Sequence, residues 1–330
     1  MNLLNKASQI DRTQWDSLCR RSSTSSIFQT PQMYDFYQRT GLYRQVAVAV
    51  EEEGEMKGVA VAVVQEEGLG LRRTLSRRAI VNGGPLLADN ISPEALKALL
   101  HALCAQLRHR CTYLECRNLN DYSPVKALFK GCGFEYKPHY NFHIDTSDPA
   151  EALRRIDKSR RRRIRRATEA GATVSQDPTA LDAFYAILHR LYHDRLHRPL
   201  PSLPFFRLLL QEPFAHAFFV RDTADNVIGG QIILTLAGQT AYAWYCCGLD
   251  HEYHALYPSI MANYAAIHFA ATHRFSRYDM MGAGSPDEDY GVRDFKAQFG
   301  GTLVEHGRFL KIFRPTVYRL GSHIMKHLSR

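Results

Sequence analysis

The same order of predicted elements occurs twice along the chain, and this repetition restricts the folds that it can adopt. In the first half, the run RQVAVAVEEEGEMKGVAVAVVQ at 44–65 alternates β-branched residues on both sides of Gly54. This pattern predicts a hairpin, with a turn longer than two residues. A serine cap and Pro93 then begin an amphipathic helix at 92–110. A strand at 112–119, a helix near 123–130 and a strand at 134–144 complete this half.

The second half repeats this order more fully. A helix of about 20 residues is predicted between Pro149, which follows a cap at Ser147 or Asp148, and Gly171. A short strand, a helix at 178–196, three strands within 216–250, a helix at 257–273 and strands at 276–281 and 301–313 follow. Helices that cover mixed sheets define an α+β fold. We therefore predict two domains, at 1–146 and 147–330.

Composition agrees with two globular domains, because 45% of the 330 residues are hydrophobic. The sequence has no apolar run of about 18 residues, and MNLLNKASQIDRTQW lacks the apolar core of a signal peptide. A cytoplasmic location is expected. The seven cysteines form no CxxC pair, and the 15 histidines form no HExxH motif. Reduced structural thiols and a site without metal are therefore predicted.

A basic segment, DKSRRRRIRRATEAG at 157–171, carries much of the excess charge. Residues 151–170 contain nine Lys or Arg and three Asp or Glu, a net +6, against +9 for the whole chain. One basic segment on a near-neutral body favours a local site for a phosphate-bearing partner, and Arg160, Arg161 and Arg165 are the candidates. Arg160 lies on the apolar stripe of this helix, where a charge must be paired or line a cavity. The alternative is a solvated face with one snorkelling arginine. No motif indicates DNA binding.

A glycine-rich segment near the end, YDMMGAGSPDEDYGVRDFKAQFGG at 278–301, is the most informative. A strand that ends at Met280 or Met281 leads into a long acidic loop. A short helix then presents Arg293 and Lys296 three residues apart on one face. Such loops at strand ends often carry binding groups, although the glycines alone could form simple turns.

This segment resembles the C-terminal signature of the Fem family of non-ribosomal peptidyltransferases, which add amino acids to peptidoglycan precursors from aminoacyl-tRNA. Three other segments are similar to family motifs: IFQTPQMYDFY, in which Met33 replaces an aromatic residue, SRRRRIRRATEAGATV and LYPSIMANYAAIHFA. These matches occur in order over nearly the whole chain.

The resemblance implies two tandem acetyltransferase-like (GNAT) domains, which agrees with the repeated order of elements. It also implies a precursor groove at the second domain, with basic side chains on a diphosphate, and no bound cofactor. In the family, a lysine after the phenylalanine of FK stabilises charge during acyl transfer, and this position is Lys296, after Phe295. Larger members carry a coiled-coil arm. No sustained heptads occur here, so the use of charged tRNA stays open.

The chemistry would be aminolysis, in which a neutral amine attacks an ester or thioester carbonyl and Lys296 stabilises the oxyanion. Asp279 is a candidate to orient or deprotonate the amine. The remaining substrate-binding candidates are Tyr242 and Trp244, which share one face of a strand, Tyr192 and Arg195, which lie one helical turn apart, and Arg293 and Phe295.

Two alternatives remain open. The first is an acyl-CoA-dependent N-acyltransferase of envelope polysaccharide biosynthesis, although LDHEYHALYPS at 249–259 contains no glycine for a pyrophosphate loop. The second is a non-catalytic RNA-binding or membrane-associated protein. The basic segment PTVYRLGSHIMKHLSR could then rest on the inner membrane surface, where lipid-linked precursors occur.

Overall fold

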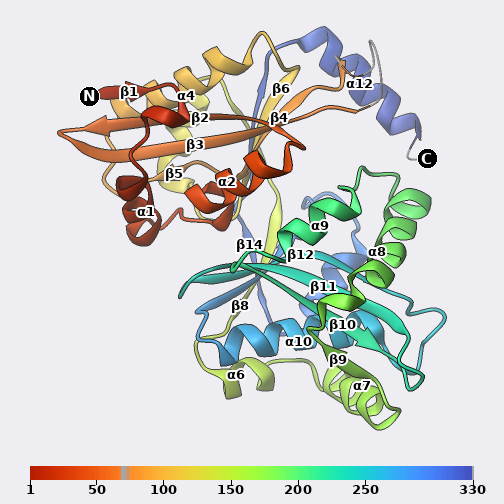
Figure 1. Cartoon of the computed structure of the whole chain (residues 1–330). Helices are drawn as coiled ribbons and strands as arrows, with labels where there is room; N and C mark the ends of the chain where they lie inside the picture. The colour runs from red at the N-terminus through yellow and green to blue at the C-terminus, as the bar shows by residue number, and fades with distance from the viewer. Residues whose placement is uncertain (68–72, 74, 329–330) are drawn as a thin grey trace. The chain divides into compact units, whose positions relative to one another are not determined.

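The computed structural model describes residues 1–67, 73 and 75–328, and the side chains up to residue 321. The described chain divides into two compact units. Unit 1 comprises Met1–His139 and His306–Arg330, and unit 2 comprises Tyr140–Glu305. Each unit has a mixed sheet with helices on both faces, so the predicted α+β class is confirmed (Figure 1).

The sheet of unit 1 has the described strand order β1-β2-β3-β4-β6-β15-β7, with β5 beside β3. Its strands are β1 (Asn2–Leu4), β2 (Arg44–Glu52), β3 (Glu55–Gln65), β4 (Arg78–Gly83), β5 (Leu86–Leu87), β6 (Tyr113–Asn118), β7 (Glu135–Lys137) and β15 (Arg308–Ile312). Its helices are α1 (Arg12–Arg21), α2 (Pro31–Thr40), α4 (Pro93–Leu107), α5 (Lys126–Gly131) and α12 (Pro315–Leu328), with single 3-10 turns η1 (Ala7–Gln9), η2 (Ile27–Gln29) and η3 (Ser123–Val125).

Side-chain alternation explains how this sheet is covered on both faces. Val46, Val48 and Val50 of β2 point into the core under α4, whereas Ala47 and Ala49 pack on the side of α1. The β2–β3 hairpin was predicted correctly, but its turn is shorter than expected. Glu53 and Gly54 both have positive φ (52° and 82°), the backbone of a two-residue type I′ turn.

The sheet of unit 2 has the strand order β14-β8-β13-β12-β11-β10-β9. Its strands are β8 (Tyr140–Asp145), β9 (Thr173–Ser175), β10 (Ala215–Arg221), β11 (Val227–Leu236), β12 (Thr240–Gly248), β13 (Arg277–Gly282) and β14 (Thr302–Glu305). Its helices are α6 (Pro149–Arg154), α7 (Lys158–Glu169), α8 (Leu181–Arg190), the π-helix η5 (Leu191–Leu196), α9 (Leu203–Leu209), α10 (Pro258–Thr272) and α11 (Gly291–Ala297), with a 3-10 turn η4 (Pro178–Ala180). Figure 1 shows α8 and α9 on one face of the sheet, and α6, α7 and α10 on the other.

The single helix predicted between Pro149 and Gly171 is two helices in the structure. Asp157 interrupts it, because its side chain accepts a hydrogen bond from Ser159 N at 2.7 Å and caps the start of α7. A capping aspartate competes with the helical backbone pattern at this position.

The compact units also begin and end at different residues from the predicted domains. The predicted strand 134–144 is divided between β7 and β8, and the strand 301–313 between β14 and β15. β15 pairs with β6 and β7, so the last 25 residues, 306–330, belong to unit 1 and not to a domain at 147–330. β8 pairs with β13 and β14, so unit 2 begins at Tyr140.

No helix in the described ranges is long and apolar enough to cross a membrane. The predicted amphipathic character of α12 depends on side chains beyond residue 321, which lie outside the described residues.

Candidate functional site

Two parallel strands of unit 2 diverge at their C-terminal ends. β12 and β13 pair only where Thr240–Tyr242 face Arg277–Asp279, although β12 continues to Gly248 and β13 to Gly282. The parallel pair of unit 1, β4 and β6, stays in register over six residues, to the end of both strands. An open strand end of this kind offers backbone groups and side chains to a ligand.

Irregularities in both strands accompany the divergence. In β12 the register shifts so that Ala243 faces Ile233 and Tyr245 faces Ile232, which leaves Trp244 as an extra residue. In β13 the register shifts between Asp279 and Gly282, and Met281 has a φ of 62°. Bulges of this kind bend a strand and end regular pairing.

Lys296 of α11 lies at this open end of β13. Its Nζ donates to three consecutive backbone carbonyls: Met280 at 2.5 Å, Gly282 at 2.7 Å and Met281 at 3.4 Å. Burial lowers the pKa of Lys296 from 10.5 to about 8, against the opposing effect of the Asp279 carboxylate. The protonated amine therefore sits among three backbone carbonyl oxygens at the irregular end of β13.

Asp279 is fully buried beside this lysine. Its Oδ1 accepts a hydrogen bond from Met281 N at 2.7 Å, and its Oδ2 lies 3.4 Å from His143 Nε2. Burial alone would raise the pKa of Asp279, but the contact with His143 and the charge of Arg277 hold the pKa below its usual value. Asp279 is thus a carboxylate at neutral pH and a weak base, suited to orientation more than to proton abstraction.

Arg293 and Phe295, the other candidates of α11, organise their surroundings. The guanidinium of Arg293 donates to three backbone carbonyls of the preceding loop: Ala283 at 3.0 Å, Glu288 at 3.1 Å and Ser285. Phe295 packs against Phe299, with ring centroids 5.4 Å apart. Both side chains hold α11, and with it Lys296, in place.

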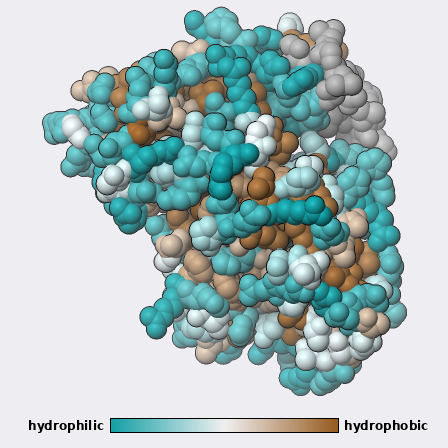
Figure 2. Space-filling model, viewed as in Figure 1, coloured by the Kyte–Doolittle hydropathy of each residue, from teal (hydrophilic) through white to brown (hydrophobic). Residues whose placement is uncertain are grey.

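The arginines of α7 do not converge on one place. Arg160 is 4% exposed, and its guanidinium lies 4.4 Å from the ring centroid of Phe295. Arg161 and Arg165 are exposed, and Figure 2 shows mainly hydrophilic residues at the lower end of the view, where Figure 1 places α7. The helix therefore presents one arginine to α11 and a solvated row to the outside.

The aromatic candidates lie on the face of the sheet that α8 and α9 cover. Tyr242 is fully buried, and burial raises its pKa to about 12. Trp244 packs against Phe205 of α9, with ring centroids 5.9 Å apart. The bulge adds Tyr245 to this face, because Tyr242 and Tyr245 face Leu234 and Ile232, which point the same way. Sequence alternation alone had missed Tyr245.

The helix predicted to carry Tyr192 and Arg195 is π-helical there. Hydrogen bonds in a π-helix run from residue i to i+5, so residues three apart no longer share a face as they do in an α-helix. Tyr192 contacts Tyr245, with ring centroids 5.9 Å apart, whereas Arg195 is exposed. The structure brings Tyr192 to the aromatic cluster but not Arg195.

The cysteine at this site is not set up as a nucleophile. Cys246 accepts a hydrogen bond from Asn263 Nδ2 at 3.3 Å, and burial raises the pKa of its thiol to about 12, so it is a poor nucleophile. No group of three or more His, Cys, Asp or Glu within the described part of the chain is arranged to hold a metal ion.

Comparisons with known proteins bear on the fold of the chain. Residues 153–296 match the acetyltransferase (GNAT) domain family. The structure is similar to the crystal structure of FemX, with a TM-score of 0.73 and 15% identity over 97% of this chain and 99% of that chain. The chain has the tandem GNAT fold. A tandem GNAT protein from the clavulanic acid biosynthesis pathway is also similar, with a TM-score of 0.58 and 13% identity over 94% and 98% of the two chains.

A third similar structure is the C-terminal domain of a putative lysylphosphatidylglycerol synthetase from Agrobacterium fabrum, with a TM-score of 0.60 and 11% identity over 92% of this chain and 90% of that chain. No curated protein matches the sequence. The family match, over residues 153–296, supports an acyltransferase of the GNAT type, and the identities to the solved structures establish the fold alone.

Acetyltransferases of this fold bind the coenzyme A pyrophosphate at a helix N-terminus, which is that of α10 here. The donors at this terminus are already used. Ser259 N donates to the Asp250 carboxylate at 3.1 Å, Ile260 N and Met261 N both donate to Tyr257 O, and Pro258 has no N–H. A carboxylate in this position repels a pyrophosphate, so the residues present do not fit that group.

Proposed function

We propose that this protein transfers an aminoacyl group to the amine of a phosphate-bearing cell-envelope precursor of the peptidoglycan type. The observation that carries the proposal is Lys296, a protonated amine held at the open ends of β12 and β13. The resemblance of the segments around Lys296 and α7 to Fem peptidyltransferases, together with the similarity to FemX, supports this substrate class.

Transfer then proceeds without a covalent enzyme intermediate. The acceptor amine attacks the ester carbonyl of the donor, a C–N bond forms, and the carbonyl oxygen becomes an oxyanion. The C–O bond to the leaving hydroxyl breaks, and the amine proton passes to that oxygen. Two N–H bonds of Lys296 are directed at Met280 and Gly282, and the third has only the long 3.4 Å contact to Met281. This third donor is the one that turns to the oxyanion.

Asp279 positions this lysine. Its negative charge favours the protonated form of Lys296, and its hydrogen bond from Met281 N fixes the bulge whose carbonyls hold the amine. The aromatic side chains of Trp244, Tyr245 and Tyr192 would border the acyl group or the acceptor.

Charged tRNA is the proposed donor, because the Asp250 carboxylate at the start of α10 disfavours coenzyme A. Acyl-CoA is the alternative donor, and the match to the acetyltransferase family favours it.

Mass spectrometry tests both the reaction and the donor. The protein is incubated with muropeptide precursors and with either aminoacyl-tRNA or acyl-CoA. The proposal predicts an acceptor heavier by one aminoacyl residue, and only with charged tRNA. Equal or faster transfer from acyl-CoA would favour the alternative, and no transfer from either donor would contradict the proposed function.

A further inference from the structure

A row of three side chains crosses the sheet of unit 2 where β12 and β13 part. His143 of β8 faces Asp279 of β13, and Asp279 faces Tyr242 of β12. Side chains of directly paired residues point to the same face of a sheet, so the three lie together on the face that carries Tyr245. The pairing of β12 with β13 ends at this row, which therefore borders the strand ends at which Lys296 lies. His143 was not predicted as a site residue.

His143 and Asp279 are in contact through their side chains. His143 Nε2 lies 3.4 Å from Asp279 Oδ2, and the aspartate is fully buried. The other carboxylate oxygen accepts a hydrogen bond from Met281 N, which fixes the orientation of the carboxylate. A carboxylate beside one ring nitrogen of a histidine favours the proton on that nitrogen and leaves the lone pair on the other, Nδ1. The distance is long for a hydrogen bond, and such contacts often tighten when substrate binds.

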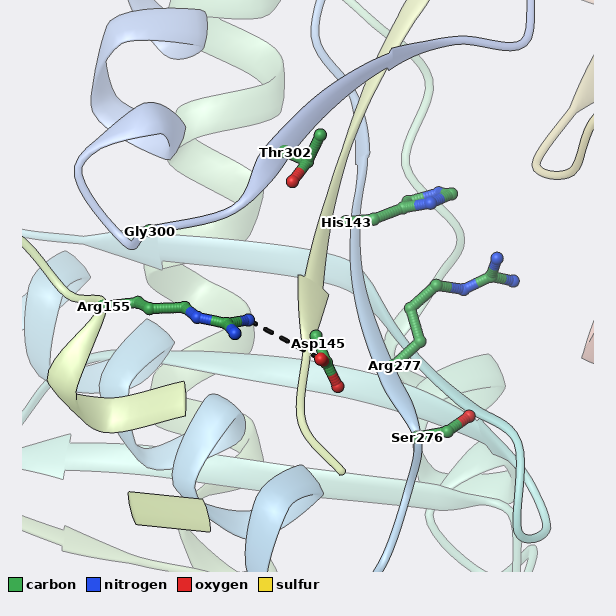
Figure 3. A pocket seen from close by; sticks show the side chains of 7 residues that line it. All are labelled: His143, Asp145, Arg155, Ser276, Arg277, Gly300 and Thr302. Atoms are coloured by element: carbon green, nitrogen blue, oxygen red, sulfur yellow. Dashed lines mark ion pairs between the residues drawn. The ribbon is translucent and has the colours of Figure 1, made fainter. Parts of the chain in front are cut away.

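The surroundings of the His143 ring are charged but balanced. Figure 3 shows that the imidazole points away from Arg155 and lies on the same side as Arg277. The charged groups around the ring come from β13, from β8 itself and from α6: Asp279, Arg277, Asp145 and Arg155. Arg155 NH1 lies 3.6 Å from Asp145 Oδ2, so these two charges offset each other. From β14, His143 faces the uncharged Thr302. His143 also lines a cavity of about 210 Å³ that opens on unit 2, which gives the ring a route for protons to solvent.

A second polar side chain of β8 indicates that this face receives a polar ligand. Asn141 lies two residues before His143 and therefore points to the same face. It is 2% exposed, and its Nδ2 has no hydrogen-bond partner among the described residues. An unpaired buried donor is costly, so its position suits an oxygen atom of a ligand or a water molecule. The apolar residues of β8, Phe142 and Ile144, point into the core on the opposite face.

The proposed reaction needs a proton acceptor that the neighbouring side chains do not supply. An aliphatic amine is protonated at neutral pH and must lose a proton before it can attack. The pKa of Asp279 is held below its usual value, and Lys296 acts in its protonated form. Burial raises the pKa of Tyr192, Tyr242 and Cys246 to about 12, so these groups keep their protons at neutral pH. Imidazole is the general base that enzymes use most often.

We propose that His143 is the general base that converts the ammonium group of the acceptor into the attacking amine, and that Asp279 orients its ring. Nδ1 of His143 takes one proton from the ammonium nitrogen, whose lone pair then forms the C–N bond. A second proton of this nitrogen passes to the leaving oxygen. The proton on His143 leaves to solvent, so each turnover releases one proton. This inference rests on the proposed function, because it assigns one step of that reaction.

The pH dependence of turnover tests this assignment, with muropeptide precursors and the donor that supports transfer by the wild-type protein. His143→Gln should lower turnover at pH 7 by about 100-fold or more with little change in acceptor affinity, because general bases contribute about that much to the rate. Between pH 6 and about 7.5 the remaining turnover should rise about tenfold per pH unit, since only the free amine then reacts. Added imidazole should restore part of the turnover of His143→Ala. Pyrazole, which has the same shape but is a far weaker base, should not.

His216 of β10 supplies a matched control, because it is a histidine of the same sheet that packs against Phe269, with ring centroids 4.6 Å apart. His216→Gln should keep the turnover and the pH profile of the wild type, and circular dichroism should show that all variants are folded. Wild-type turnover of His143→Gln, equal losses in His216→Gln, or equal rescue of His143→Ala by imidazole and pyrazole would each overturn the assignment of His143. Each of these results leaves transfer by the wild-type protein, and so the proposed function, intact.

Nitrogen-15 NMR of the histidine rings gives a readout that needs no acyl donor. The signals of His143, assigned with His143→Gln, should be those of the tautomer with the proton on Nε2 when the ring is neutral, because Asp279 lies beside that nitrogen. A neutral ring with its proton on Nδ1 has no lone pair for the acceptor and would overturn the role of His143 even in an active protein. No transfer by the wild-type protein from any donor would instead contradict the proposed function, and this step with it.

Discussion

Arg160 is a charged residue that is part of a core. Its guanidinium lies 4.4 Å from the centroid of Phe295 and 5.3 Å from that of Phe299, and it donates a weak hydrogen bond to Phe295 O at 3.5 Å. Aromatic faces attract a desolvated guanidinium, which partly offsets the cost of burial. The sequence indicated that Arg160 lies on an apolar stripe, but the aromatic partners 135 and 139 residues further on were not predictable from local pattern.

Arg160→Ala should destabilise unit 2 by about 2 kcal/mol, because the stacking and the packing of the aliphatic stem are both lost. The matched change Arg161→Ala, on the exposed side of the same helix, should stay within about 0.5 kcal/mol of wild type. Chemical denaturation measures both values. Equal effects of the two substitutions would show that Arg160 has no special role in packing.

The lowered pKa of Lys296 predicts how turnover depends on pH. Burial lowers its pKa from 10.5 to about 8, so the protonated form that the mechanism requires is lost as pH rises above about 8. The pH profile of the turnover number should therefore fall on its alkaline side near pH 8. In Lys296→Arg any residual activity should lose this decline, because a guanidinium stays charged. A decline at the same pH in both proteins would assign it to another group.

At the scale of elements, close packing between α6, α7 and the turn from α11 to β14 fixes the site. Gly300 has a φ of 80° and lies against the Arg155 backbone. Any side chain there would have to adopt a left-handed backbone conformation and would also collide with the Arg155 carbonyl. At Gly291, the start of α11, an added Cβ would meet no atom within 4 Å, and φ is not positive.

Gly300→Ala should destabilise the protein by about 3 kcal/mol, from the left-handed backbone and the collision with a carbonyl. Gly291→Ala should be neutral or slightly stabilising, because it mainly reduces the entropy of the unfolded chain. Thermal melting compares the two variants. If Gly300→Ala melts at the wild-type temperature, the contact between this turn and α6 is not as tight as described.

Local pattern predicted most of the elements but not their interruptions. The alternation in β2 and β3 and the caps at Ser92 and Asp148 were sufficient to predict the hairpin and the starts of α4 and α6, because these features depend on neighbours in sequence. The bulge at Trp244, which adds Tyr245 to the aromatic face, depends on pairing with β11. Lys296 was identified from its motif, whereas its three carbonyl partners depend on the packing of α11 against the end of β13.

At the scale of the whole molecule, the chain leaves unit 1 at residue 139 and returns to it at residue 306. β15 lies between β6 and β7, and its Phe309 stacks on Phe129 with ring centroids 4.0 Å apart. Prediction from the order of elements along the sequence assigns a returning strand such as β15 to the same domain as the residues that precede it. For this reason the predicted domain 147–330 differs from the compact unit.

The compact unit 140–305 and the predicted domain 147–330 can be compared directly by expressing each as a separate fragment. Residues 140–305 should fold alone with a cooperative thermal transition, because the fragment contains every strand of its sheet. Residues 147–330 should be poorly folded, since this fragment lacks β8 and exposes the apolar face of β15. A cooperative transition of 147–330 and none of 140–305 would contradict the division into units.

The central claim is that Lys296 stabilises charge in the transition state of acyl transfer. Lys311 of β15 is a matched control, because its Nζ also donates to a backbone carbonyl, that of Cys132 at 2.8 Å, but in unit 1. Methionine keeps the approximate length and packing of either side chain.

The decisive measurement is the steady-state turnover and acceptor affinity of Lys296→Met, Lys311→Met and wild type, with equal melting behaviour confirmed first. We predict that Lys296→Met loses about 100-fold or more in turnover with little change in acceptor affinity, and that Lys311→Met matches wild type. Normal turnover and normal affinity of a folded Lys296→Met variant would contradict the account.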